Sequence, residues 1–144
     1  MNEKIQILLI DDEPDILYVL RLMLSTEGFE VSVAENGAVA LEKIATTKFD
    51  VVVCDYMMPK MDGPTILRQV REKKDYTPFI FFSGLDDENL GAKMIGLGAY
   101  EFLPKSHIQK LIETLKKTVK YNEAFKNLNE INEESDDFLK LINS

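Results

Sequence analysis

Residues 49–55 have the sequence FDVVVCD, in which an apolar run of strand length ends in an aspartate. A run without alternating polar residues predicts a strand that is buried on both faces of a parallel sheet. Similar apolar runs that end in polar residues recur at residues 5–12, 79–83 and 100–105. The fold is therefore expected to centre on parallel strands that carry polar side chains at their carboxyl ends.

Segments with helical spacing separate these apolar runs, and residues 29–34 alternate as a further strand. Pro14 is suited to the first turn of a helix, and Ser106 is expected to cap the last one. We predict helices at about residues 14–27, 37–45, 62–72, 86–97 and 106–120. The sequence thus predicts five successive strand–helix units in one α/β domain that spans residues 1–120.

Residues 121–144 differ in composition from the rest of the chain. They are rich in Asn and Glu, they contain no Gly or Pro, and Phe125, Leu128 and Ile131 keep a roughly helical spacing. We predict a helical C-terminal extension or connector here. It is either a solvated continuation of the last helix or a helix that docks on a partner, because a short apolar stripe fits both.

Length and composition exclude several classes of protein. A chain of 144 residues suits one domain with a proper core, and 45% hydrophobic with 29% charged residues is typical of a globular protein. No apolar run is long enough to span a membrane, and the N-terminus lacks the features of a signal peptide. We therefore expect a soluble, cytoplasmic protein with no membrane partner.

Charge and cysteine content narrow the choice further. The net charge is -8, from 17 basic and 25 acidic residues, and this repels a phosphate backbone. Direct binding of nucleic acid by this chain is therefore not expected. The single cysteine, Cys54, cannot form an internal disulfide and is expected to be buried within its apolar run.

Polar side chains occupy the predicted carboxyl ends of four strands. These residues are Asp11, Asp12, Asp55, Ser83 and Lys105. Each one alone has an ordinary explanation, such as a helix cap or a surface charge. In an open parallel sheet, however, the carboxyl ends of the strands form the edge where ligands bind. Four strands that deliver one chemically coherent set to one edge predict a functional site.

The chemistry of this set indicates a metal ion and a phosphoryl group. Three carboxylates in one crevice stay ionised together only beside a cation, and Mg²⁺, with Mn²⁺ as an alternative, prefers such oxygen ligands. A carboxylate beside a metal, with an ammonium group and a hydroxyl opposite, can accept a phosphoryl group to form an aspartyl phosphate. His107 is expected to be a surface residue rather than a metal ligand.

These motifs resemble the receiver domains of bacterial two-component response regulators, in particular those like the chemotaxis regulators. The resemblance covers about residues 4–120. It rests on the pair Asp11-Asp12, the block DYMMPKMDG at residues 55–63, Ser83-Gly84, and GAYEFLPK at residues 98–105. It implies a flavodoxin-like (βα)₅ fold, with a doubly wound parallel sheet of five strands in the order 2-1-3-4-5.

The resemblance also implies the roles of the acidic residues. Asp55 would be the phosphoacceptor of a phosphorylation-dependent signalling switch. Mg²⁺ would be held by Asp55, by Asp12 directly, by Asp11 chiefly through water, and by the backbone carbonyl of Met57. The protein would be a regulator that catalyses only its own phosphoryl transfer and dephosphorylation, and not otherwise an enzyme.

The switch and the partners follow from the same resemblance. Ser83 and Lys105 would contact the phosphoryl group, and Phe102 would turn inward when Ser83 moves toward it. The phosphodonor would be a sensor histidine kinase or a histidine phosphotransfer protein. The signal would reach an output protein or domain through the surface of the last two strand–helix units, where a homodimer could also form, through residues 121–144, or through a domain outside this sequence.

Two departures from the family pattern carry consequences. Ser106 follows Lys105, where relatives usually have a proline after a cis peptide bond. A cis bond before a residue other than proline costs about 2.5 to 4 kcal/mol, so the bond is either strained or trans, with Lys105 aimed differently.

Met57 and Leu85 are apolar where some relatives carry polar residues that orient the hydrolytic water. We therefore predict a long-lived phosphoryl group.

Two other functions compete with the switch. An aspartate-nucleophile phosphohydrolase would use the same metal chemistry, but it would need an acid two residues beyond Asp55, where Met57 stands. A pseudo-receiver would keep the fold and bind partners without phosphorylation. Only the missing proline after Lys105 favours the pseudo-receiver, since all the expected site residues are present.

Overall fold

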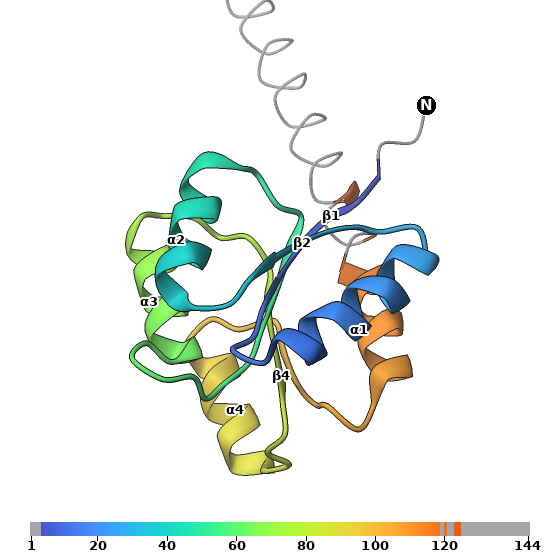
Figure 1. The fold of residues 1–144 in the computed structure, drawn as a ribbon. Coiled ribbons are helices and arrows are strands. Elements are labelled where there is room, and N and C mark those ends of the chain that lie inside the picture. Colours follow the sequence, from blue (N-terminus) through green and yellow to red (C-terminus); the bar gives the residue numbers. More distant parts are fainter. Residues whose placement is uncertain (1–3, 119, 121–122, 125–144) are drawn as a thin grey trace, which may run out of the picture.

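A parallel five-stranded sheet forms the centre of the molecule in the computed structural model, which describes residues 4–118, 120, 123 and 124 (Figure 1). The strands lie in the order β2-β1-β3-β4-β5, which confirms the predicted topology. The strands are β1 Gln6–Ile10, β2 Glu30–Ala34, β3 Val51–Cys54, β4 Phe79–Ser83 and β5 Glu101–Pro104. Since neighbouring strands are parallel, all their carboxyl ends lie at one edge.

Helices cover both faces of the sheet (Figure 1). The helices are α1 Pro14–Thr26, α2 Gly37–Thr46, α3 Gly63–Glu72, α4 Glu88–Gly96 and a last helix at residues 108–118. One core cluster joins the sheet to α1 and the last helix, and we call this side the α1 face. A second cluster joins the sheet to α2, α3 and α4, and we call this side the α3 face.

Local signals in the sequence set the helix limits. Pro14 occupies the first position of α1, and the side chains of Asn36, Asp62 and Asp87 accept backbone N–H groups at the starts of α2, α3 and α4. Such caps satisfy amide groups that have no partner within the helix. Gly28, with φ of 93°, reverses the chain after α1, in a conformation that suits glycine.

The apolar runs behave as their composition predicts. Every residue of β3 and β4 is buried, because helices cover these central strands on both sides. The parallel register then aligns the strand ends. The Asp55 N–H donates to the carbonyl of Ile10 at 2.8 Å, and the Lys105 N–H donates to the carbonyl of Ser83 at 2.7 Å. The residues that follow the strands are therefore fixed relative to one another.

Met23 and Ile95 are 37% and 49% exposed, because the apolar stripes of α1 and α4 are wider than the contact each helix makes. One sequence-based expectation was wrong, since Ser106 does not cap the last helix. Residues 105 and 106 form a turn and the helix begins at 108, since the Lys105 amide continues the pairing with β4.

Two expectations concern the ends of the chain and the membrane. The predicted extension, residues 121–144, lies outside the described residues except for 123 and 124. Within the described part of the chain, no helix has both the length and the apolar character needed to cross a bilayer.

Candidate functional site

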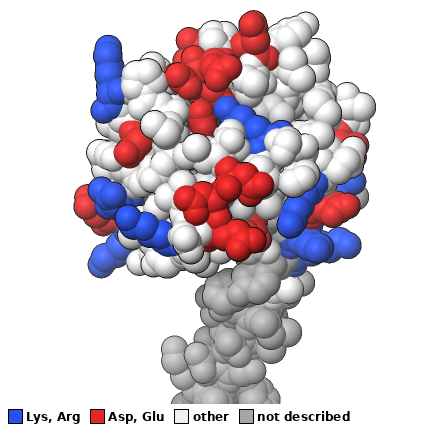
Figure 2. Space-filling model, turned by 90° about the horizontal axis from the view of Figure 1, so that it is seen from below, with Lys and Arg blue, Asp and Glu red and all other residues white. Residues whose placement is uncertain are grey.

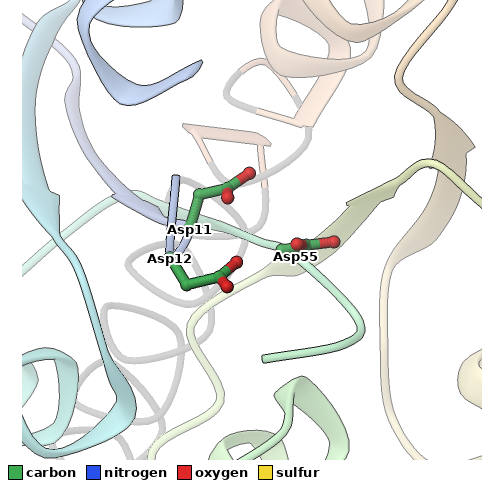
Figure 3. Close-up of side chains that lie close together, drawn as sticks. All are labelled: Asp11, Asp12 and Asp55. Atoms are coloured by element: carbon green, nitrogen blue, oxygen red, sulfur yellow. The ribbon is translucent and has the colours of Figure 1, made fainter. Parts of the chain in front are cut away.

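Three aspartates meet at the carboxyl edge of the sheet (Figure 3). Asp11 and Asp12 follow β1, Asp55 follows the adjacent β3, and one carboxylate oxygen from each lies within 4.8 Å of the others. Asp11 and Asp55 are buried, with 3% and 8% of their surface exposed, whereas Asp12 is exposed. The structure thus brings together the three carboxylates that the sequence singled out.

Lys105 points into this group from the end of β5. Its Nζ lies 2.7 Å from Oδ2 of Asp11 and 3.4 Å from Oδ2 of Asp55. All peptide bonds of the described residues are trans, including the bond from Lys105 to Ser106. The ammonium group therefore reaches the carboxylates with serine in the place of the usual proline.

The charges of the site act on one another. Burial, and then repulsion from Asp11, raise the pKa of Asp55 above its ordinary value, although Lys105 opposes both effects. Burial lowers the pKa of Lys105, but its contacts with Asp11 and Asp55 outweigh burial and leave this pKa raised. Lys105 is thus held as a cation between two carboxylates. The site as a whole still carries an excess of negative charge that a cation would relieve.

The two buried aspartates have different hydrogen bonds. Asp11 accepts the N–H of Glu13 at Oδ1, at 3.0 Å, while its Oδ2 faces Lys105. Asp55 accepts the N–H of Tyr56 at Oδ1, at 2.9 Å, and its Oδ2 is the oxygen nearer to Lys105. Each of these carboxylates therefore has a protein group near both of its oxygens, and Lys105 lies closer to Asp11 than to Asp55.

The donor set suits a hard divalent cation. Carboxylate oxygens are the ligands that Mg²⁺ prefers, and a few of them suffice because this ion keeps waters or phosphate oxygens in its other positions. Acidic side chains gather in clusters on the face at the carboxyl ends of the strands, which Figure 2 shows from below. Such clustering raises the local concentration of cations. The residues present therefore fit Mg²⁺.

The remaining predicted residues lie nearby on β4 and β5. Ser83 ends β4 with 2% of its surface exposed, and its Oγ accepts the N–H of Leu85 at 3.2 Å. Phe102 lies half-buried in β5. Met57 has an exposed side chain, which leaves its backbone as the part that can serve the site. His107 is exposed, as expected.

Two residues with tertiary contacts were missed in the sequence, one beside the site and one at the opposite edge of the sheet. Tyr56 packs its ring against Phe81 and Phe102, and Arg71 donates to the carbonyls of Asp75, Thr77 and Gly98. The role of Tyr56 could have been suspected, because it is an aromatic residue directly after Asp55. No local signal marks Arg71, because its carbonyl partners come from two loops that only the fold brings together.

The fold and the acidic site define a class of protein, the phosphorylation-dependent receiver. The family model for the response regulator receiver domain matches residues 7–116. The chain belongs to this family, the receiver domains of two-component response regulators, and its function is phosphorylation-dependent signalling.

Curated relatives include two transcriptional regulators. The chain is 38% identical over 101 residues to the transcriptional regulatory protein TrcR of Mycobacterium tuberculosis, in an alignment covering 70% of this chain and 39% of TrcR. It is 36% identical over 105 residues to PhoP of Bacillus subtilis, an alkaline phosphatase synthesis regulator, covering 73% and 43% of the two chains. The chain thus spans about two fifths of the length of these relatives.

Solved receiver domains have the same fold. The receiver domain of response regulator 1452 from Francisella superposes with a TM-score of 0.79 at 30% identity, over 83% of this chain and 99% of that one. The response regulator TrrA of Thermotoga maritima, solved in complex with Mg²⁺ and BeF, gives a TM-score of 0.72 at 32% identity, over 79% and 98% of the two chains.

Proposed function

We propose that Asp55 is the phosphoacceptor of this receiver domain. The proposal rests on the position of the Asp55 carboxylate. This carboxylate is buried beside those of Asp11 and Asp12, and Lys105 Nζ lies 3.4 Å from its Oδ2. An oxygen of Asp55 would attack the phosphorus atom of the donor, and the bond from phosphorus to the donor's leaving atom would break. The ammonium of Lys105 would balance charge on the transferred group.

Backbone and side-chain contacts orient the proposed nucleophile. The Tyr56 amide holds Oδ1 of Asp55, so the carboxylate has little freedom to rotate. Asp12 and Asp55 would bind Mg²⁺ directly, Asp11 would bind it chiefly through water, and the backbone carbonyl of Met57 would complete the protein's share. When bound, Mg²⁺ supplies positive charge that stabilises the phosphoryl oxygens, and Mn²⁺ can substitute.

Ser83 and Phe102 would form the switch. Among the described residues, the Oγ of Ser83 only accepts a hydrogen bond, from the amide of Leu85, so its hydroxyl would be able to donate to a phosphoryl group. The ring of Phe102 is half-buried, and it would turn inward when Ser83 moves toward the phosphoryl group. Binding of the hydroxyl to the phosphoryl group would favour one of two packings of β4 and β5.

The phosphoryl group is expected to be long-lived. Met57 and Leu85 are 65% and 41% exposed, and neither side chain can hydrogen-bond to an attacking water. We expect Met57→Asn combined with Leu85→Asn to shorten the lifetime of the adduct severalfold, because the amides can orient that water. The lifetime is measured by intact mass after the phosphodonor is removed. An unchanged or longer lifetime would contradict this explanation.

The partners follow from the family and the charge of the chain. The donor would be the phosphohistidine of a sensor histidine kinase or a histidine phosphotransfer protein, in the cytoplasm. The output would be another protein or a domain attached to this one, as in relatives that are more than twice as long as the matched region. The chain itself, at a net charge of -8, would not bind nucleic acid. A homodimer through the last two units and a chemotaxis-like subtype are further proposals.

Intact mass spectrometry tests the phosphoacceptor. The wild type and Asp55→Asn are incubated with acetyl phosphate, with and without Mg²⁺. We expect the wild type alone to gain one phosphoryl group, about 80 Da, and only when Mg²⁺ is present. An adduct of equal yield in the mutant would refute the assignment. No adduct with either acetyl phosphate or a phosphohistidine donor would favour the pseudo-receiver, and multiple turnover of a phosphomonoester would favour the phosphohydrolase.

A further inference from the structure

Three aromatic rings connect the loop after Asp55 to β5. The ring centroid of Tyr56 lies 6.0 Å from that of Phe81 and 6.1 Å from that of Phe102, at interplanar angles of 73° and 68°. Phe81 and Phe102 are themselves 6.1 Å apart. Edge-to-face pairs at this distance are favourable, because the positive edge of one ring meets the negative face of the other. The rings thus form a closed triangle.

The backbone of Tyr56 is held on both sides. Its N–H donates to Oδ1 of Asp55 at 2.9 Å, and its carbonyl accepts the N–H of Gly63 at 3.0 Å. Gly63 leaves no room for a side chain, since a Cβ there would lie 2.5 Å from both the Asp55 carbonyl oxygen and the Phe81 ring. The loop that carries the phosphoacceptor therefore also fixes the ring of Tyr56.

α4 lies on the other side of Phe102. A Cβ on Gly91 would come into ordinary van der Waals contact with Phe102, at 3.6 Å from its Cβ, so the glycine leaves the space of a methyl group beside this residue. Phe81 is fully buried, is the register partner of Phe102 on the neighbouring strand, and packs its ring against that of Phe102. Phe102 cannot change its position unless the ring of Tyr56 moves with it or the contact between them is lost.

We propose that Tyr56 is a positioning residue of the switch, whose ring holds Phe102 in its half-buried position and couples it to Asp55. This inference rests on the proposed role of Asp55. Phosphorylation would change the charge of the group that accepts the Tyr56 amide, and the effect would reach Phe102 through a single residue. This route is separate from the one through Ser83, because it uses none of the β4–α4 loop.

Fluorine NMR on the full chain tests the coupling. 4-Fluorophenylalanine is placed at position 102, and spectra are recorded before and after phosphorylation by acetyl phosphate and Mg²⁺, with the adduct verified by intact mass. The variants are Tyr56→Leu, which removes the ring, and Tyr56→Phe, which keeps it. Tyr76→Leu is the matched control, because Tyr76 is 72% exposed and makes none of the ring contacts seen among the described residues.

We expect Tyr56→Leu to shift the fluorine signal already in the unphosphorylated protein. It should also change the ratio of the two positions of residue 102 by about twofold to tenfold, the effect of one aromatic pair. Tyr56→Phe should match the wild type. Tyr56→Met, which fills the space without a ring, replaces the leucine variant if the latter does not unfold cooperatively.

Two results would overturn the proposal. One is a wild-type fluorine signal in the ring-free variant before and after phosphorylation, and the other is an equal change in Tyr76→Leu. The test is separate from that of the phosphoacceptor. If the wild type gained no adduct, the role of Asp55 and its coupling to Tyr56 would both fail, whereas an adduct with no spectral effect of Tyr56→Leu would refute the coupling alone.

Discussion

The two faces of the sheet are equally well buried but differ in composition. The α1 face packs aliphatic side chains from α1 and the last helix, and its buried aromatic residues are Phe29 and Phe82. The α3 face contains Phe49, Phe79 and Phe81, together with the partly buried Tyr56 and Phe102. All four aromatic pairs among the described residues belong to the α3 face.

The difference shows how one small sheet separates stability from switching. The aliphatic side chains on the α1 face pack with no partly exposed ring between them, so we expect this face to keep a single packing. On the α3 face, partly buried rings lie between the loop after Asp55 and β5, and we expect these rings to repack more readily. Changes to the α1 face should therefore alter stability alone, and changes to the α3 face should alter both.

We expect the largest losses of unfolding free energy in Ile80→Ala and Phe81→Ala, one variant for each face. These neighbours on β4 are fully buried and point to opposite faces. Urea unfolding should show losses of about 2 to 5 kcal/mol for Ile80→Ala and about 3 to 5 kcal/mol for Phe81→Ala. Only Phe81→Ala should change the fluorine signal at position 102, and a similar change in both variants would contradict the division between the faces.

Arg71 should have the next largest effect. Its guanidinium donates to the carbonyls of Asp75, Thr77 and Gly98 at 2.9, 3.0 and 2.9 Å, joining the α3–β4 and α4–β5 loops. We expect Arg71→Met to lose about 1 to 3 kcal/mol of unfolding free energy, because these carbonyls lose a charged donor. The exposed Arg68→Met is the control, and equal losses in the two variants would show that the three bonds contribute nothing.

Asp55→Asn should stabilise the metal-free protein at neutral pH. The raised pKa of Asp55 means that the folded state binds its proton more tightly than the unfolded chain does. Protonated Asp55 therefore stabilises the folded state. This contribution is complete below the pKa of Asp55 in the unfolded chain, and it is lost as the pH rises through the raised pKa in the folded state. Unfolding in EDTA should therefore show a gain for Asp55→Asn that shrinks at acid pH. A gain independent of pH, or one shared by the exposed Asp86→Asn, would contradict this.

We expect the smallest loss of unfolding free energy from removing an exposed ion pair on the α1 face. Lys116 Nζ lies 3.1 Å from Oε2 of Glu27, with side chains 53% and 37% exposed. Lys116→Met should lose only about 0.2 to 1 kcal/mol, because water and salt screen an exposed pair. The loss is measured by urea unfolding against Lys117→Met, and it should vanish at high salt. A loss that survives high salt would mean that the pair is not an electrostatic contact.

Much of the fold could be predicted because its central strands are continuous apolar runs. The run before Asp55 indicates a strand buried on both faces, and parallel strands bring their ends to one edge without further information. The convergence of Asp11, Asp12 and Asp55 follows from that rule. Strand limits shifted by a residue or two, as for β3, because burial extends beyond the paired region.

The directions of individual side chains could not be predicted. Whether Lys105 reaches the carboxylates depends on the turn after β5, and the sequence left two conformations of its next peptide bond open. The exposure of Met23 depends on how much of α1 the sheet covers, which helical spacing alone does not specify. The contact between Tyr56 and Phe102 joins two distant segments, and only the tertiary structure creates it.

Chemical trapping of the phosphoryl group identifies the aspartate that carries it. Borohydride reduces an aspartyl phosphate to homoserine, so the full chain is phosphorylated with acetyl phosphate and Mg²⁺, reduced, digested and sequenced by mass spectrometry. We expect homoserine at position 55 and at no other aspartate. Homoserine at Asp11, Asp12 or Asp62, or none at all in protein that carries the adduct, would contradict it.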